Sequence, residues 1–291
     1  MALLPPPICY NHTLVEYIWR CGGTPHSCTR ILDHPLETAL ELRSVPRCEV
    51  EGDSGDITLR PVRLYKDPFR GNNGYLVLCE VWLPGGAHSS NARTESMHTF
   101  ERMAAVAPRF ELRQPVRLQP AAAARESASA RSLGFEQAVA NCLYAEVGLV
   151  AARRPSGGNE AEFCVEADGV RAADNLEVMR YIVRRTGESF DLDISTGGTT
   201  KTCTVVMSTA ASRVVEQNKG VQCLRQMLER LQRQHAQFGS LCGASPSKTV
   251  AVRIPRDAES RGGGALEDRR PPANMDPHLI TSRLLQMAHQ P

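Results

Sequence analysis

The sequence contains no long apolar run. No window of its 291 residues approaches the about 18 consecutive apolar residues that a membrane-spanning helix requires. The first residues, MALLPPPICY, carry neither the basic start nor the apolar stretch of a signal peptide. We therefore expect a cytoplasmic protein without a membrane partner.

Basic runs and paired metal ligands are also missing. Lysine and arginine are spread along a chain of formal net charge +2, without interleaved aromatic residues, and so we expect no nucleic-acid partner. The ten cysteines include no C-x-x-C pair and the eight histidines no H-x-x-x-H spacing, which argues against a disulfide framework and a new zinc site. Cys79, Cys164 and Cys203 lie in apolar runs and are predicted to be buried free thiols.

The apolar content, by contrast, is sufficient for a large core. Of the 291 residues, 42% are hydrophobic and 23% charged, and this length exceeds that of a usual single domain. A stretch rich in glycine, proline and serine at residues 84–91 predicts a boundary between a domain of residues 1–90 and one of residues 91–291. Apolar alternation in the first third predicts strands at Leu14–Trp19, Ile57–Tyr65 and Tyr75–Trp82.

After the boundary, helix and strand signals alternate, as in an α+β or α/β domain. Helical patterns cover residues 97–106, 135–150 and 214–234, and two further helices are predicted to open at Asp174, with Glu177 completing a capping box, and at Asp276, with Pro277 in the first turn. Strands are predicted at residues 161–166, 202–208 and 249–254. Residues 120–134 are interpreted as a short helix or a mobile loop, and residues 256–270 as a flexible segment with a glycine hinge at 262–264.

Four ordered motifs resemble those of eukaryotic-type glutamine synthetases. The segment KDPFRGNNGYLVLCEV, residues 66–81, matches the family patterns D-P-F-R and L-V-L-C-E-V. Residues 248–277 contain RIPR and EDRRPPAN, which match the patterns I-R-I-P-R and E-D-R-R-P-x-A-N. Weaker agreement covers nearly the whole chain with gaps, and the chain is identified as a degenerate member of this family.

The resemblance implies an α+β fold in two parts. An N-terminal β-grasp domain is followed by a larger catalytic domain of antiparallel strands backed by helices, shortened here by internal deletions. Family members assemble into rings, with each active site between the N-terminal domain of one subunit and the catalytic domain of its neighbour. The implied partners are therefore further copies of this chain, or an active family member in a hetero-oligomer.

The family's reaction depends on divalent cations held by side chains. The γ-phosphoryl group of ATP passes to glutamate, ammonia attacks the acyl phosphate, and Mg²⁺ or Mn²⁺ held by glutamates and one histidine neutralises the charge. Aligned on the family motifs, two of six ligand positions keep a glutamate, while the others carry residues unsuited to a cation. The retained ligands are Glu162 and Glu267, and the replacements are Arg113, Pro115, Pro155 and Thr204.

Further parts of the family's site have no counterpart. The N-terminal loop that reaches a neighbour's site is missing near residue 50, and the flap that excludes water is missing near residue 241. Lys248 stands where the family has an arginine. By resemblance, Arg253 would lie near ATP phosphates and Arg269 near the substrate carboxylate, with Glu267 beside them. Alternatively, RIPR and EDRRPPAN only stabilise the fold, with arginine–glutamate pairs inside the domain.

Three functions remain open from the sequence. The chain is a catalytically inactive family member that acts by interaction or oligomer assembly, or it retains ATP-dependent glutamate–ammonia ligase activity, or it senses a nucleotide or amino acid without turnover. The sequence thus leaves open whether it is an enzyme. The cofactor is likewise open, and would be ATP with Mg²⁺ or Mn²⁺ if binding survives.

Overall fold

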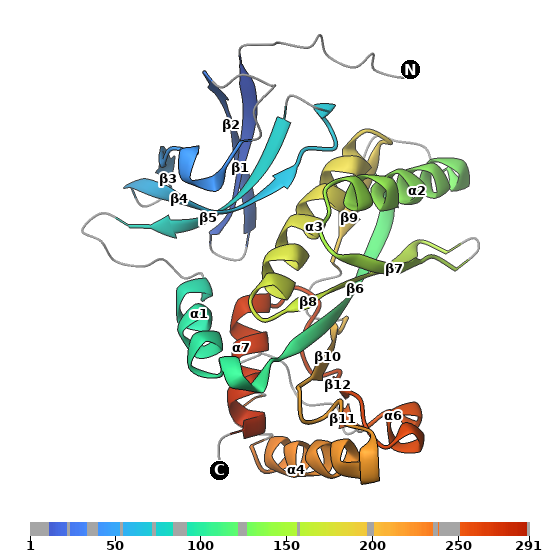
Figure 1. Ribbon diagram of the computed structural model, residues 1–291. Coiled ribbons are helices and arrows are strands. Elements are labelled where there is room, and N and C mark those ends of the chain that lie inside the picture. Colours follow the sequence, from blue (N-terminus) through green and yellow to red (C-terminus); the bar gives the residue numbers. More distant parts are fainter. Residues whose placement is uncertain are drawn as a thin grey trace.

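A computed structural model describes residues 12–21, 24–33, 40–52, 55–71, 74–83, 92–121, 127–155, 158–196, 201–234, 238 and 251–289. These residues form two sheets and the helices that accompany them (Figure 1). Among the described helices, none is long and apolar enough to cross a bilayer.

The first sheet, sheet A, has the strand order β2-β1-β5-β4-β3. The three predicted strands are confirmed as β1 (Thr13–Cys21), β4 (Gly55–Lys66) and β5 (Gly74–Trp82), and the structure adds β2 (Thr24–Leu32) and β3 (Cys48–Gly52). Strand β1 pairs in parallel with β5, whereas the other neighbours are antiparallel. Alternate residues of these strands form their own apolar core, which includes Tyr17, Leu59 and Val77.

The second sheet, sheet B, is antiparallel throughout and has the order β11-β12-β10-β6-β8-β7, with β9 on the far end of β6. Its long central strand is β6 (Arg109–Pro120). The remaining strands are β7 (Leu149–Arg153), β8 (Glu160–Asp168), β9 (Leu192–Ser195), β10 (Thr204–Ser208), β11 (Val252–Arg253) and β12 (Leu266–Asp268).

Helices cover one face of sheet B, as Figure 1 shows for α2 (Ala128–Tyr144) and α3 (Arg171–Glu188). Leu176, Met179 and Ile182 of α3 are fully buried in the larger apolar core. The other helices are α1 (Arg93–Arg102), α4 (Lys219–Arg233), α6 (Arg256–Arg261) and α7 (Pro277–His289). The predicted α+β class, with a β-grasp-type sheet followed by a larger antiparallel sheet backed by helices, is confirmed. The predicted boundary at residues 90 and 91 lies outside the described residues.

The predicted helix at residues 135–150 is shifted. Helix α2 begins at Ala128, because the Ser127 hydroxyl caps it by accepting a hydrogen bond from the Ala130 N–H at 3.2 Å. It ends at Tyr144, since Glu146 and Gly148 adopt positive φ angles of 58° and 67° and turn the chain into β7. In the ambiguous segment, residues 120–134, Pro120 is the last residue of β6, and residues 128–134 are helical after the cap at Ser127.

Two further expectations were wrong. Asp174 does not cap α3, which begins three residues earlier at Arg171; its side chain is fully buried among cationic partners. The glycine run is not a hinge, because Gly262 ends α6 in the left-handed conformation (φ 84°) and Gly264 N–H donates to the Ser212 carbonyl at 2.7 Å. By contrast, the cap of α7 is confirmed, since Asp276 Oδ1 accepts hydrogen bonds from the N–H groups of His278 and Leu279.

Candidate functional site

The side chains of β6 alternate between the two faces of sheet B, so that apolar residues lie on one face and mostly polar residues on the other. Phe110, Leu112 and Val116 are buried against the helices, while the odd-numbered residues from Arg109 to Arg117 are partly or fully exposed on the opposite side. We call this opposite side of sheet B the outer face. Strand register extends the outer face to the neighbouring strands, because residues directly opposite one another point the same way.

The register brings together residues that lie far apart in the sequence. Arg113 of β6 is opposite Cys164 of β8 and Thr204 of β10, and Pro115 is opposite Glu162. In the adjacent row, Glu111 and Glu267 both flank Val206 from opposite sides, and Arg253 follows Glu267 on β11. Six of the aligned family positions therefore share the outer face with Arg253; they are Arg113, Pro115, Glu162, Thr204, Glu267 and Arg269, while Pro155 follows β7 as an exposed residue.

Glu267 is the most enclosed carboxylate of the outer face, with a side chain that is 4% exposed. Arg253 Nε lies 2.7 Å from its Oε2 atom, and Arg269 Nε lies 2.7 Å from its Oε1 atom. Burial alone would raise the pKa of Glu267, but the hydrogen bonds and charges of Arg269 and Arg253 outweigh it and hold the pKa below its ordinary value. Both oxygens of this predicted metal ligand are thus occupied by guanidinium groups.

The second retained glutamate also has a cationic partner. Glu162 Oε1 accepts a hydrogen bond from Arg153 Nε at 2.9 Å. The Arg153 side chain is 77% exposed, so this pair contributes little to stability.

Two other carboxylates of the outer face are also paired with arginines. Glu111 Oε1 lies 2.5 Å from Arg113 Nε, and Glu166 Oε1 lies 2.7 Å from Arg109 Nε. Burial alone would lower the pKa of Arg113, but the hydrogen bond and charge of Glu111 raise it above its ordinary value, so the guanidinium stays charged. The pattern E-x-R at residues 111–113 was the sequence signal for the Glu111–Arg113 pair, and sequence reasoning missed it.

A divalent cation does not fit this arrangement. No group of three or more histidine, cysteine, aspartate or glutamate side chains suited to a metal occurs in the described ranges. Glu162 and Glu267 are separated by three strand spacings across the sheet and by four residues along the strand direction. At ordinary strand geometry this places their Cα atoms roughly 20 Å apart. The two retained ligands cannot share one ion, and each is already paired with arginine.

A second polar cluster, also missed from sequence, joins sheet A to the helices. Asp174 Oδ1 lies 2.8 Å from both Arg93 Nε and His278 Nε2, and its Oδ2 lies 3.4 Å from Arg63 Nη1. Arg93 also pairs with Glu80 of β5 at 3.2 Å. Burial alone would raise the pKa of Asp174, but His278 and Arg93 outweigh it and hold that pKa well below its usual range.

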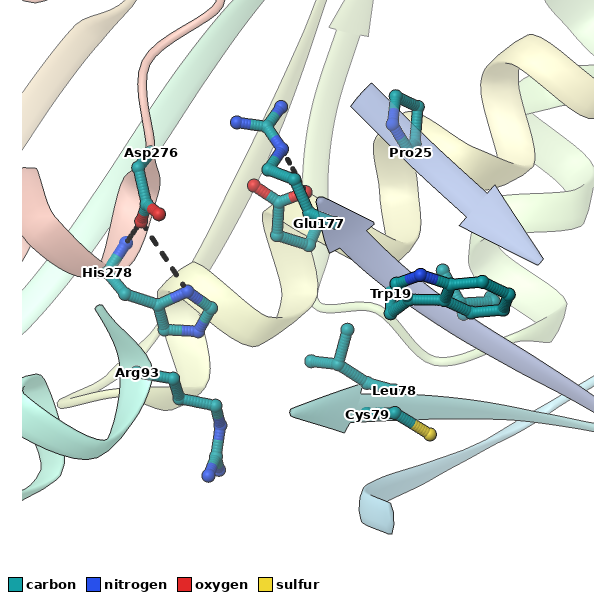
Figure 2. A pocket seen from close by; sticks show the side chains of 10 residues that line it. Trp19, Pro25, Leu78, Cys79, Arg93, Glu177, Asp276 and His278 are labelled. Atoms are coloured by element: carbon teal, nitrogen blue, oxygen red, sulfur yellow. Dashed lines mark hydrogen bonds and ion pairs between the residues drawn. The ribbon is translucent and has the colours of Figure 1, made fainter. Parts of the chain in front are cut away.

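A small cavity lies beside this cluster and is lined by Trp19, Leu78, Arg93, Glu177 and His278, among others (Figure 2). Its volume is about 20 Å³, which suits roughly one water molecule. It is therefore too small for a nucleotide or an amino acid. The cluster and its cavity connect parts of the fold, and the outer face is the better candidate for function.

Fold and site together define an α+β protein with a small mixed sheet and a larger antiparallel sheet whose outer face carries paired charges. No family model matches the chain. A chloroplastic glutamine synthetase of Oryza sativa subsp. japonica is 26% identical over 337 residues, covering 94% of this chain and 77% of the relative. The cytosolic glutamine synthetase isozyme 1-5 of Arabidopsis thaliana is 24% identical and a glutamine synthetase of Debaryomyces hansenii is 26% identical, each covering 94% of this chain and, respectively, 94% and 88% of the relative.

The similarity spans both sheets, because it covers nearly the whole chain. These similarities support a distant and divergent relation of the chain to the glutamine synthetase family. The aligned length of 337 residues exceeds the 291 residues of this chain, so the rice relative has segments without a counterpart here.

Proposed function

We propose that this chain is a glutamine synthetase-like protein without glutamine synthetase activity, which acts by assembling with itself or with an active relative. The observation that carries the proposal is that both retained glutamates are hydrogen-bonded to arginines. Both oxygens of Glu267 are held by Arg253 and Arg269, and one oxygen of Glu162 is bonded to Arg153, so each retained glutamate has an arginine partner.

The replaced positions support the same proposal. Arg113 lies at the centre of the outer face with its charge fixed by Glu111. A divalent cation beside this guanidinium would experience like-charge repulsion, and Pro115 next along the face offers no side-chain oxygen. Phosphoryl transfer depends on positioning and on neutralisation of the developing charge. A face that holds its carboxylates in arginine pairs lacks the groups to hold the neutralising ions.

An activity assay tests the loss of catalysis. Purified chain is incubated with glutamate, ammonia, ATP and saturating Mg²⁺ or Mn²⁺, and glutamine is measured by mass spectrometry. We expect no glutamine above the background of the Glu267→Gln variant, while an active relative run in parallel produces it. Glutamine formed by the unaltered chain but not by Glu267→Gln would overturn the proposed inactivity.

A separate measurement tests assembly. Gel filtration with light scattering is performed on the chain alone and on its mixture with an active family member. We expect a mass larger than one chain in at least one of the two samples. A mass of one chain in both, across the accessible concentration range, would rule out the assembly role.

A further inference from the structure

Two cysteine side chains of sheet A meet although their strands lie at opposite edges of the sheet. Cys28 belongs to β2 and Cys48 to β3, the first and last strands of the order β2-β1-β5-β4-β3. In a flat sheet, four strand spacings would place these two strands about 19 Å apart. The two Sγ atoms are nevertheless only 3.9 Å apart. Sheet A is therefore coiled, and its two edges converge over one face.

The converging edges enclose the apolar core of sheet A. Cys48 is 3% exposed and is part of this core, while Cys28 packs against it as a partly exposed residue. A third thiol, Cys79 of β5, is 1% exposed, and its Sγ atom donates to the Val77 carbonyl at 3.5 Å. Of these three thiols, Cys28 is the one that a reagent can approach from solvent.

The thiols of Cys28 and Cys48 lie within reach of a covalent bond. Both cysteines are free in the structure. Because a disulfide bond is about 2.05 Å long, each sulfur atom has to move by roughly 1 Å to form one. A rotation of about 30° about χ1 moves Sγ by roughly this distance. The bond would connect β2 to β3 across 20 residues of the chain.

The environment of the pair sets how fast it can react. Burial raises the pKa of the Cys28 thiol to about 12, and the charge and hydrogen bond of Cys48 and the charge of Glu16 add to this effect, whereas Arg30 opposes it. The other titratable groups that interact with the pair are Tyr17 and Cys79. Since thiolates and not thiols attack disulfides, the pair reacts slowly at neutral pH and faster as pH rises.

We propose that Cys28 and Cys48 form an oxidisable dithiol site, which a small disulfide such as glutathione disulfide converts into a reversible protein disulfide. The Cys28 thiolate attacks one sulfur of the small disulfide and releases one thiolate, and the Cys48 thiolate then attacks the Cys28 sulfur and releases the second. The two cysteines are oxidised, and the reagent is reduced to two thiols that take up the two cysteine protons. The site is independent of the proposed function, because it uses no residue of the outer face of sheet B.

Equilibration in a glutathione redox buffer tests this site. The reduced full chain is incubated with glutathione disulfide at about pH 8.5, where thiolates are more abundant, with and without urea. The reaction is stopped with acid, and peptide mass spectrometry locates the bridges. We expect a bridge between Cys28 and Cys48 in the native chain, which dithiothreitol removes. We also expect the bridge to raise the Tm by about 5–10 °C, because it restricts the unfolded chain.

Variants assign the bridge to this pair. Cys28→Ser is expected to abolish it, and Cys48→Ser is expected to leave Cys28 as a mixed disulfide with glutathione, since the second thiol is then missing. Cys223→Ser is the control, because Cys223 is a partly exposed thiol of α4 whose sulfur contacts that of Met227 at 3.8 Å. This variant is expected to form the bridge to the same extent as the wild-type protein. Circular dichroism of each reduced variant confirms that it is folded.

Three outcomes in the wild-type protein would overturn the dithiol site. They are the absence of a bridge in the native chain, a bridge from Cys28 to Cys79 in place of Cys48, and a bridge that forms only in urea. The last would show that the unfolded chain, and not the coiled sheet, brings the two thiols together. None of these outcomes depends on whether a variant folds.

Discussion

At the residue scale, His278 has the environment with the clearest consequence for stability. Its ring is fully enclosed, contacts Asp174 at 2.8 Å, and lies 3.8 Å from Asp276. Burial alone would lower the pKa of His278, but the hydrogen bond and charge of Asp174, with the charges of Asp276 and Glu177, raise it above its ordinary value. Arg93 and Arg63, bound to the same aspartate, and Glu80, paired with Arg93, supply the other charges of the cluster.

This environment predicts a dependence of stability on pH. A histidine whose pKa is higher in the folded state contributes stability that is complete below its unfolded pKa of about 6.5 and is lost as pH rises through the folded pKa. We therefore expect the free energy of unfolding to decrease as pH is raised from about 6.5, and His278→Gln to remove that component. Urea unfolding at a series of pH values measures it.

His98 provides the matched control, because its side chain is 71% exposed and its ion pair with Glu101, at 3.6 Å, is exposed as well. His98→Gln is expected to leave the pH profile of the wild-type protein unchanged. Parallel profiles for the wild-type protein and His278→Gln would contradict the prediction, since they would show that this histidine binds the same number of protons in both states.

At the scale of elements, the glycine run between α6 and β12 forms a packed contact. A Cβ atom added to Gly263 would lie 2.9 Å from the Ser212 carbonyl oxygen and 3.0 Å from that of Val214. These are backbone atoms, which cannot rotate away as a flexible side chain does. The sequence pattern predicted a hinge because three glycines permit many conformations, whereas the tertiary structure uses their small size.

The consequence is that Gly263→Ala destabilises the protein. We expect a loss of about 1–3 kcal/mol, the usual cost of overpacking, measured by urea unfolding. Gly158→Ala is the control, because the nearest atom to its added Cβ lies at 3.4 Å, an ordinary contact. Equal stability of the two variants would indicate that the 262–264 segment tolerates bulk and is the flexible connection that its sequence suggested.

At the scale of the whole molecule, sheet A is joined to α3 by several buried polar contacts. Tyr65 donates to Asn175 Oδ1 at 2.9 Å, Tyr181 donates to Glu16 Oε1 at 3.1 Å, and Arg63 reaches Asp174. Breaking a buried ion pair from one side leaves an uncompensated charge. The two sheets are therefore expected to lose structure together.

Both tryptophans, Trp19 and Trp82, lie in sheet A, so their fluorescence reports on that sheet, while far-ultraviolet circular dichroism reports mainly on the helices. We expect the two urea transitions of the wild-type protein to coincide. Asp174→Asn is expected to cost about 3–5 kcal/mol and to separate the transitions.

The exposed pair of Asp257 with Arg261 supplies the control for this experiment. Asp257→Asn is expected to cost less than about 1 kcal/mol and to keep the transitions together. Separate transitions in the wild-type protein would show that the contacts between sheet A and α3 do not couple the two parts.

The sequence by itself determined several local elements and indicated a resemblance to one family. Alternation predicted β1, β4 and β5, the Asp276-Pro277 pair predicted the start of α7, and four ordered motifs indicated the glutamine synthetase family. Alignment on these motifs also identified Glu162 and Glu267 as candidate metal ligands, because motifs and local patterns depend only on neighbouring positions in the chain. The predicted roles of Arg253 and Arg269 stay predictions.

Only the tertiary structure decided what those residues contact. The period of two assigns Glu162 to a face of its strand, but which residue lies opposite depends on register with strands distant in sequence, and that register brought Arg153 beside it. In the same way, the local sequence predicted Asp174 as a helix cap, whereas in the structure its carboxylate is paired with Arg93 and His278. Long-range packing sets the partners of buried charges, because a buried carboxylate without a cation would be too costly to retain.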